Sequence, residues 1–370
     1  MSTALTREQG DLRDAVADLM TKRSPEAEVR RLMAEEPGYD AAVWAELAGM
    51  GLLGLTIPEE FGGAGAGAAE LSVVSEQMGR ALLCAPYLST AVLTPYLLVA
   101  LGDAAECAEV LPRIAAGELI TTVAFAEPGQ SRPSERPATT ATDSNGWRIS
   151  GEKTYVLDAN TAQRLYIYAD TGSGTALFAV DRDAAGISVI DLDTIDRTRR
   201  QGRLILDQVP ARLIGTPDRG WAALNTALDR TAVALVAEQA GGAMHSMQMG
   251  TDYARTRFQF ARAIGSFQAV KHMCVDMLLE AESAVSAARH VAASFDAAEP
   301  DRLADLALAQ AYCSDAYVWV AATNIQVHGG IGFTWEHPAH LYLRRARTDA
   351  QILGDSAWHR ERYVGLREES

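Results

Sequence analysis

The segment Tyr253–His272, YARTRFQFARAIGSFQAVKH, gathers arginine and aromatic side chains that could bind a ligand. On a helix, Tyr253 and Arg257 are four residues apart and Arg257 and Phe260 are three apart, so we expect one shared face near a helix end. Gln268 follows just beyond the next turn. An arginine fork beside aromatic rings suits a phosphate next to a flat heterocycle. Spacing alone favours the alternative, a solvated basic face with core phenylalanines.

The overall charge restricts the possible partners. The 370 residues include 48 acidic and 33 basic side chains, which gives a formal net charge of −15. Such a surface repels phosphate backbones, so we expect no nucleic-acid partner. No uncharged run approaches the roughly 18 residues of a membrane span, and the first residues are polar. We therefore expect no membrane partner and a cytoplasmic location.

No metal or disulfide chemistry is predicted. The four cysteines are far apart in the sequence and form no CxxC pair, so neither a zinc site nor a disulfide framework is indicated. His337 and His340 lie beside Glu336, but their spacing is not that of a helical HExxH motif, and Pro338 interrupts it. Histidines on the surface before a helix are the simpler interpretation.

Composition predicts three parts along the chain. Residues 1–118 show helical periodicity, for example in AAVWAELAGMGLLGL and AELSVVSEQMGRALL. The glycines of TIPEEFGGAGAG do not fit GxGxxG and have no strand–helix crossover around them, so a tight turn is expected there and not a dinucleotide site. The helical period returns at about Asp218 and continues to the end.

Between these helical parts the sequence is typical of short strands. The predicted strands are TTVAFAE, WRISGEKTYVL, RLYIYAD, TALFAVD, GISVIDL and RLILDQV. Asn145-Gly146 indicates a hairpin just ahead of the second of them. Because no helices alternate with these strands, we expect a small antiparallel barrel or sandwich and not a Rossmann sheet. The predicted fold is α+β and mainly α: an N-terminal helical domain (1–118), a middle β domain (119–216) and a C-terminal four-helix bundle (217–370).

The helices of the bundle have recognisable ends. One long helix is expected over WAALNTALDRTAVALVAEQAGGAMHSMQMGTDYARTR, residues 221–257, and Ser266 is the predicted N-cap of the next. A third helix is expected to open at Asp301 or at Glu299-Pro300 and to stop at Gly329 and Gly330. A fourth follows Pro338.

Several long motifs together resemble the acyl-CoA dehydrogenase family along nearly the whole chain. They are IPEEFGGAGAG, AEPG, WRISGEKTYV, YARTRFQFARAIGSFQAVKH and QVHGGIGFTWEHP, in the family's order and spacing. The resemblance implies a helix–barrel–helix subunit of a dimer or tetramer, with FAD held between subunits. It also implies α,β-desaturation of an acyl-CoA, with electrons passed to an electron-transfer flavoprotein.

The resemblance assigns the arginine-rich segment to the ADP half of FAD. Arg257 would pair with the pyrophosphate, and glycines at the end of QVHGG would let backbone N–H groups approach phosphate oxygens. The family usually has glycine and proline where this chain has Ala261 and Ala263, which affects the turn more than the contacts. The cofactor-binding residues implied by the resemblance are Arg257, Gln259, Phe260, Gln268, Gln326, His328, Gly329 and Gly330.

The catalytic base of the family has no counterpart at either usual position. Desaturation needs a carboxylate near the substrate α-carbon. The family places its glutamate near the C-terminus, where this chain has Leu353, or early in the long helix, where it has Thr231. Asp229 is rotated roughly 200° around the helix from Thr231, and Glu238 shares its face roughly 10 Å further along. These two carboxylates are the candidates for a base, with Asp355 a third.

The strand segments that face the flavin in the family are also altered. Ala126 replaces a threonine before EPG, and Ser131-Arg132-Pro133 replaces a GSD-like run after it. Tyr155 keeps the aromatic ring of a second motif, whereas Leu157 stands where the family has a threonine. Several polar contacts to the flavin ring are therefore missing together.

These losses indicate a subunit that binds a neighbour's nucleotide but lacks the base. The hypothesis is a base-lacking partner subunit of a heteromeric acyl-CoA dehydrogenase, similar to those among bacterial enzymes acting on steroid side-chain or dicarboxylic acyl-CoAs. Three alternatives stay open. They are a self-sufficient homo-oligomer using Asp229 or Glu238, a flavin-dependent oxygenase-like relative, and a non-enzymatic scaffold.

Overall fold

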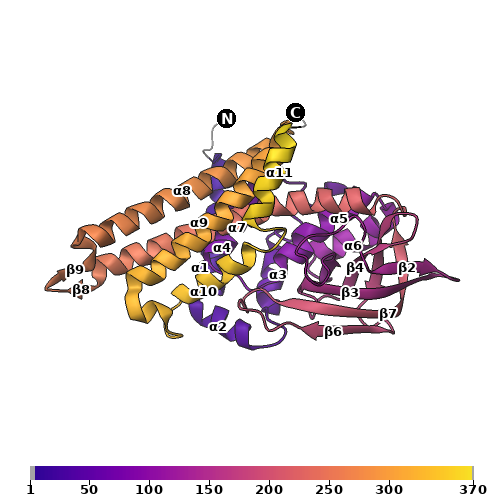
Figure 1. Ribbon diagram of the computed structural model, residues 1–370, viewed down its shortest axis with the longest axis horizontal. Helices are drawn as coiled ribbons and strands as arrows, with labels where there is room; N and C mark the ends of the chain where they lie inside the picture. Colours follow the sequence, from indigo (N-terminus) through magenta and orange to yellow (C-terminus); the bar gives the residue numbers. More distant parts are fainter. Residues whose placement is uncertain (1–4, 369–370) are drawn as a thin grey trace. The chain divides into compact units, whose positions relative to one another are not determined.

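The computed structural model describes residues 5–368 (Figure 1). Its contacts divide the chain into two compact units. We call residues 1–30, 68–83 and 232–370 the helical unit, and residues 31–67 and 84–231 the barrel unit. The chain passes from one unit to the other within α2 (Glu26–Ala34) and within the long α7 (Gly220–Thr256). The predicted boundaries after residues 118 and 216 remain predictions.

The barrel unit begins with short helices whose ends are fixed by capping. The Asp40 side chain accepts from the backbone N–H groups of Ala42 and Val43, which starts α3, and Asp103 caps α6 in the same way. Gly62 ends a 3₁₀ turn with φ +79°, so the glycine-rich segment is a turn. The helical elements are α3 (Ala41–Gly49), η1 (Glu59–Phe61), the π-helical η2 (Tyr87–Leu93), α5 (Thr94–Leu101) and α6 (Ala104–Ala115).

The strands of the barrel unit form a closed ring. Strand β4 pairs with β2 and β5, and the ring continues from β2 through β3 and β7 back to β5. Strand β1 pairs with β4 and β6 with β7 outside this ring. The pairings of β4 with β1 and β2 are parallel and the others are antiparallel. The strands are β1 (Thr121–Ala124), β2 (Thr140–Asp143), β3 (Trp147–Leu157), β4 (Arg164–Asp170), β5 (Thr175–Asp181), β6 (Ile187–Asp191) and β7 (Gln201–Ile214).

The strand predictions are confirmed, with one omission. All six predicted segments form strands, and β3, β4 and β5 have the predicted bounds. Strand β2 was missed because TATD is short and polar, with three of its four residues exposed. Asn145, at φ +66°, and Gly146, at φ +114°, lie in the loop that joins β2 to β3, so the predicted hairpin is present.

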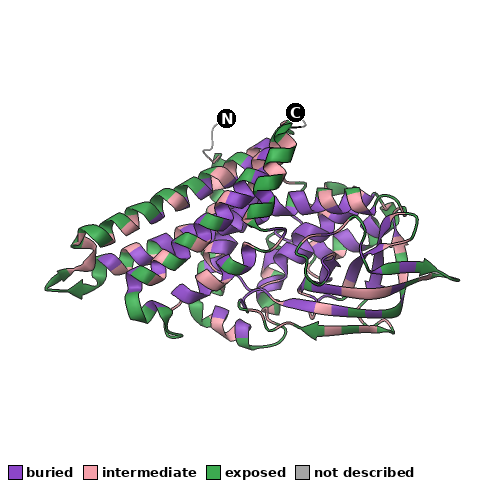
Figure 2. Cartoon of the chain, viewed as in Figure 1, coloured by how far each residue is buried: buried purple, intermediate pink, exposed green. Residues whose placement is uncertain are grey.

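The helical unit is built around α9 (Figure 2). Helix α9 packs against α8, α10 and α11, and α1 packs against α4. The buried positions of α9 follow the helical period through most of its length, so α9 presents buried faces to several neighbouring helices. The helices are α1 (Arg7–Arg23), α4 (Ala68–Arg80), α8 (Gln268–Asp296), α9 (Arg302–His328), α10 (Ala339–Asp349) and α11 (Ser356–Glu368). The predicted α7–α10 helices are therefore present, and α11 is an additional one.

Glycines allow α4 and α7 to cross with their backbones in contact. A Cβ on Gly79 would lie 2.1 Å from the Glu238 carbonyl oxygen, and one on Gly241 would lie 2.0 Å from that of Glu76. Both distances are far below van der Waals contact, so no larger residue fits at either position without moving a helix. This crossing fixes Glu238 against α4.

The segment between α7 and α8 differs from the prediction in two respects. Helix α7 ends at Thr256, and β8 (Phe258–Gln259) pairs with β9 (Arg262–Ala263). Phe260 and Ala261 form the turn between them, with φ +52° and +61°. The prediction that Phe260 shares a helix face with Tyr253 and Arg257 is therefore wrong, because the chain leaves the helix first.

The predicted N-cap of α8 is also wrong. The first residue of α8 is Gln268 and its N-cap is Phe267, whose side chain makes no capping hydrogen bond. The Ser266 hydroxyl instead donates to the Ala263 carbonyl at 2.7 Å, because η3 (Ile264–Ser266) lies between the hairpin and the helix. The prediction for α9 is confirmed, since Asp301 is its N-cap and Gly329 ends it.

The hairpin turn makes a testable prediction about its alanines. Ala261 has φ +61°, in the left-handed region that costs an L-residue about 1–2 kcal/mol. Replacing Ala261 by glycine removes that cost. Glycine also makes the unfolded chain more flexible, which lowers the free energy of unfolding by about 0.5 kcal/mol. We expect Ala261→Gly to raise the free energy of unfolding by about 0.5–1.5 kcal/mol in urea titration. Ala263 has an ordinary φ of −59°, so Ala263→Gly should lower the same quantity; equal signs for the two variants would contradict the turn geometry.

Candidate cofactor-binding site

The side chains of the arginine-rich segment project from a short hairpin that backbone hydrogen bonds hold in place. The Arg257 N–H donates to the Tyr253 carbonyl and its carbonyl accepts from the Ile264 N–H, both at 2.8 Å. The Arg262 guanidinium lies over the Phe267 ring at 3.9 Å from the ring centroid. The Phe260 side chain, 88% exposed, extends outward from the turn. The backbone of the segment is therefore fixed while its aromatic tip is open to a ligand or to another chain.

Positive charge is available at this hairpin. Within residues 5–368 the Arg257 guanidinium forms no ion pair or hydrogen bond, and both Gln259 and Gln268 are exposed. Gln268 is the first residue of the 29-residue helix α8, whose N-terminus has no side-chain cap. The free N–H groups and the helix dipole make such an end attractive to an anion. Arg257 and this helix end are both suited to phosphate oxygens.

The second implicated segment lies at the C-terminal end of α9. Gln326, Gly329 and Gly330 are exposed, and a Cβ built on either glycine would meet no atom within 4 Å. Gly329 has φ +64°, a conformation that favours glycine. This stretch of backbone therefore faces open space, into which a ligand could approach closely.

His328 lies beneath this backbone and does not face solvent. Its ring stacks on Tyr253 with ring centroids 4.3 Å apart and lies 4.2 Å from that of His337. Its Nδ1 is 2.8 Å from the Asn324 carbonyl oxygen, and burial lowers its pKa. Because Tyr253 is one turn before Arg257, this stack brings the end of α9 next to the end of α7. The stack was not predicted, because the two rings are far apart in the sequence.

Neither usual base position carries a group that can accept a proton. The Thr231 hydroxyl is buried and donates to the Ala227 carbonyl at 2.7 Å. Leu353 is buried with φ +65°. The Asp355 carboxylate accepts from the Trp358 backbone N–H at 2.8 Å and so caps the start of α11. The Thr231 hydroxyl therefore bonds the backbone of its own helix, and the Asp355 carboxylate caps the start of another.

The two other candidate carboxylates are both buried. Glu238 forms an ion pair with Arg345, with Oε1 and Nη1 2.5 Å apart and both side chains nearly inaccessible to solvent. The second Arg345 nitrogen donates to the Leu83 carbonyl. Asp229 is 8% exposed in the first half of α7. Sequence spacing could not show the Arg345 partner, because 107 positions separate it from Glu238.

The AEPG motif contains a buried ion pair that the sequence interpretation missed. The Glu127 carboxylate accepts from the Lys153 ammonium at 2.8 Å and from the backbone N–H groups of Ala138 and Thr139. Burial opposes its ionisation, but the Lys153 hydrogen bond and charge and the two N–H groups outweigh burial and lower its pKa to about 2. Burial lowers the pKa of Lys153 to about 8. The pair fixes the loop after AEPG against β3.

This pair predicts how stability depends on acid. The pKa of Glu127 falls from 4.5 to about 2 on folding, so its contribution is complete above pH 4.5 and is lost as pH falls through 2. The shift corresponds to about 3 kcal/mol. We expect unfolding titrations between pH 5 and 3 to show a shallower loss of stability for Glu127→Gln than for the unchanged protein. Parallel curves for the two proteins would contradict the assigned pKa.

The strand motif that the resemblance implies would face a flavin has an irregular backbone. Tyr155 has φ +52° and is 54% exposed, in a register shift of the β3–β7 pairing between Lys153 and Val156. Leu157 is buried, and its carbonyl accepts from the Thr122 hydroxyl at 2.6 Å. Leu157 therefore presents no hydroxyl group to a cofactor.

No helix in the described part of the chain is long and apolar enough to cross a membrane. Across residues 5–368, histidine, cysteine and acidic side chains form no group of three or more that could hold a metal ion.

Comparison with known proteins identifies the family. Residues 6–118 match the model of the acyl-CoA dehydrogenase N-terminal domain, and residues 218–364 match that of the C-terminal domain. The chain belongs to the acyl-CoA dehydrogenase family. It is 34% identical over 343 residues to the acyl-CoA dehydrogenase IpdE2 of Mycobacterium tuberculosis, covering 92% of each protein.

Solved structures extend the similarity to the whole fold. The ChsE4-ChsE5 complex from Mycobacterium tuberculosis matches with a TM-score of 0.90 and 28% identity, covering 100% of each chain. A variant of the Tcur3481-Tcur3483 steroid ACAD matches with a TM-score of 0.87 and 32% identity, covering 98% of each chain. The predicted arrangement of helices, strands and helices is therefore confirmed as the fold of this family.

Proposed function

We propose that this chain is the subunit of an FAD-dependent acyl-CoA dehydrogenase that binds the ADP half of FAD while a related subunit supplies the catalytic base. The observation that carries the proposal is an asymmetry. The implicated residues other than His328 are exposed, and Arg257 has no side-chain partner within residues 5–368, whereas Thr231 and Leu353 occupy the base positions. The proposed substrate is an acyl-CoA thioester, and the proposed electron acceptor is an electron-transfer flavoprotein.

The residues of the helical unit fit the phosphate-bearing half of FAD. Arg257 has no ion-pair partner in residues 5–368, so binding a pyrophosphate breaks no existing interaction. The N-terminus of α8 offers free N–H groups, with Gln268 beside them. Gly329 and Gly330 have no side chain, so the space beside their backbone is open to a ligand. FAD, when bound, supplies the acceptor for the hydride that leaves the substrate.

The remaining half of the chemistry requires a base, which neither Glu238 nor Asp355 is free to provide. Removing the α-proton needs a carboxylate free to accept it. Glu238 is held by Arg345, and separating a buried ion pair costs about 3–5 kcal/mol. The Asp355 carboxylate caps a helix. A partner with glutamate at the position of Thr231 or Leu353 would complete the site.

Two of the similar structures support a hetero-oligomer. The ChsE4-ChsE5 complex and the Tcur3481-Tcur3483 ACAD are each named for two components. In an assembly of that kind, one chain can lose its base without loss of activity provided that the other keeps it. In a homodimer the same loss would affect every site.

The proposal is tested by measuring acyl-CoA-dependent dye reduction by this chain, by a related glutamate-bearing subunit and by their co-purified mixture. We expect turnover in the mixture and none from this chain alone. The second candidate is a self-sufficient enzyme using Asp229, which is favoured by the burial of that carboxylate two residues from the base position. Turnover by this chain alone that disappears in Asp229→Asn would establish that candidate and overturn the proposal.

A further inference from the structure

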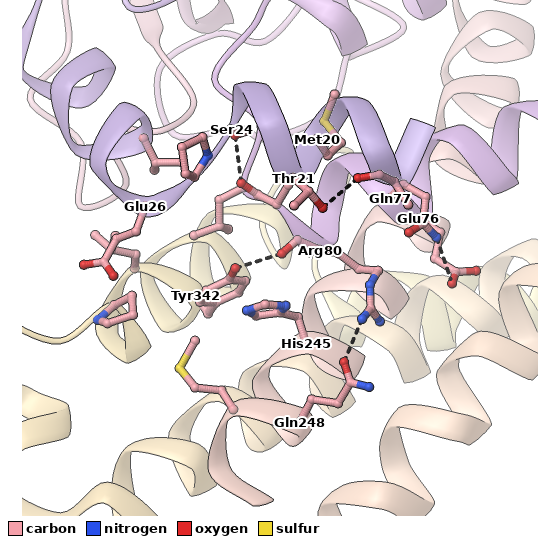
Figure 3. Close-up of a pocket in the computed structure, with 18 of the residues that line it drawn as sticks. Met20, Thr21, Ser24, Glu26, Glu76, Gln77, Arg80, His245, Gln248 and Tyr342 are labelled. Carbon is pink, nitrogen blue, oxygen red and sulfur yellow. Dashed lines mark hydrogen bonds between the residues drawn. The ribbon is translucent and has the colours of Figure 1, made fainter. Parts of the chain in front are cut away.

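The helical unit contains a cavity of about 690 Å³ that is separate from the cofactor-binding segments and from both base positions. Helices α1, α4, α7 and α10 and the start of α2 enclose it (Figure 3). Cavities of about 300–1,000 Å³ are the size that holds small-molecule ligands. Its lining includes none of the residues that the acyl-CoA dehydrogenase chemistry requires, so its role is independent of the proposed function.

The walls of the cavity are fixed by hydrogen bonds to the end of α4. The Tyr342 hydroxyl donates to the Arg80 carbonyl at 2.8 Å, and the Ser24 hydroxyl donates to the Ala81 carbonyl at 3.0 Å. These bonds use carbonyls that have no partner within the helix. The α10 and α1 walls are therefore held at a set distance from α4, and the cavity is preformed.

Part of the cavity lining is apolar, and we call these residues the apolar wall. Met20 is 3% exposed, Leu82 is 2% exposed and Leu341 is 1% exposed. Val29 and Met249 also line it. Methionine side chains adapt to ligands of different shape. This wall suits the hydrocarbon body of a ligand and offers it no hydrogen-bond partner.

The His245 imidazole projects from α7 into the cavity. The His245 ring stacks on Tyr342 with centroids 4.8 Å apart and planes 17° apart, and Figure 3 shows it between Tyr342 and Arg80. Its two nitrogens make no hydrogen bond to any residue in 5–368. Burial, and next the Arg80 charge, lower its pKa to about 4, so at neutral pH it offers one donor and one acceptor. The ring is half-buried, so its nitrogens stay accessible to a molecule in the cavity.

The charged groups of the lining balance one another. The lining contains Arg13 and Arg80 together with Glu26 and Glu76, which gives two charges of each sign. The Arg80 guanidinium donates to the Gln248 side chain at 2.7 Å, which partly satisfies it. An ion entering this space would lose its hydration without gaining a net opposite charge. The lining therefore favours an uncharged ligand.

We propose that this cavity binds a small neutral amphipathic molecule, with its hydrocarbon body against the apolar wall and a hydroxyl or carbonyl group hydrogen-bonded to His245. A hydroxyl can use either ring nitrogen, and a carbonyl uses the ring N–H. The ligand completes the hydrogen bonding of an imidazole that the chain leaves open.

Four probes with one eight-carbon chain separate the possible head groups. Calorimetric titration of the purified full-length chain would compare 1-octanol, 2-octanone, octanoate and octylammonium. We expect the two neutral probes to bind about tenfold or more tightly than either ion, since burying an uncompensated charge costs more than one hydrogen bond contributes. No binding of any probe, or tighter binding of either ion, would overturn the proposal.

Substitutions locate the bound probe. Ala17 lines the cavity on α1, whereas Ala15 is exposed on the same helix and does not. Ala17→Phe should abolish binding of 1-octanol and Ala15→Phe should leave it unchanged. His245→Phe keeps the ring stack and should weaken binding about tenfold, because one hydrogen bond is lost. His245→Asn keeps a donor and an acceptor and should weaken it less. Full binding by Ala17→Phe, or equal binding by the two His245 variants, would refute the assignment.

Discussion

Replacing Arg257 by alanine is expected to weaken FAD binding by the assembled enzyme about 10- to 100-fold. The guanidinium has no other partner in the described part of the chain, so its loss removes a charge-assisted hydrogen bond to phosphate and disturbs little else. Such bonds contribute about 1.5–3 kcal/mol. The measurement is the dissociation constant for FAD, from the recovery of flavin fluorescence on dilution, in the presence of the partner subunit.

Arg255 provides the matched control. It lies on the last turn of α7, its side chain is 73% exposed, and it pairs with Asp252 at 3.3 Å. Exposed ion pairs contribute about 0–1 kcal/mol, so Arg255→Ala should leave FAD affinity nearly unchanged. If the two alanine variants bound FAD equally, the hairpin would not be the pyrophosphate site.

Replacing Lys153 by methionine is expected to lower the free energy of unfolding of the barrel unit by about 3–5 kcal/mol. Lys153 is fully buried and pairs with Glu127, and removing one member of a buried ion pair leaves the other charge without compensation. Two backbone N–H groups would still bond the carboxylate, but they do not neutralise it. Urea denaturation followed by tryptophan fluorescence gives the value.

Two further variants separate charge from packing. Arg148 is an exposed cation on the same strand, so Arg148→Met should change stability by less than about 0.5 kcal/mol. In the double variant, Glu127→Gln removes the uncompensated charge and should recover part of the loss caused by Lys153→Met. A loss below about 1 kcal/mol for Lys153→Met would show that Glu127 is satisfied without it.

The fold was predictable where local patterns decide the structure. The strands β3, β4 and β5 were placed correctly because β-branched and aromatic residues run between clear turn residues. The end of α9 was predicted from Gly329, whose positive φ requires a residue without a side chain. Strand β2 was missed because its polar residues carry no such signal.

Interactions between distant parts of the sequence were not predictable. The pairing of Glu238 with Arg345 depends on the packing of α7 against α10, and the stacking of Tyr253 on His328 depends on that of α7 against α9. A periodicity describes one helix and gives no information about which helix lies beside it. Phe260 was misplaced for a different reason, since a two-residue turn with positive φ at Ala261 has no glycine to mark it.

For the candidate site, the sequence predicted which residues take part but not how they are arranged in space. Exposure of Gln259, Gln268 and Gln326 agrees with a ligand-binding role, whereas His328 lies beneath the surface as a support for Gly329. The assignment of these residues to FAD remains a prediction. The absence of a carboxylate at positions 231 and 353 could be predicted, because the residue types alone show it.

The proposed division of roles between two subunits requires one shared flavin site, and counting the bound FAD is the most direct test. This chain would be co-expressed with a glutamate-bearing related subunit, and FAD and protein would be quantified in the purified complex and in each subunit alone. We expect one FAD for every two chains in the complex and almost none in this chain by itself. One FAD per chain in a homo-oligomer of this protein would contradict the division of roles between the two subunits.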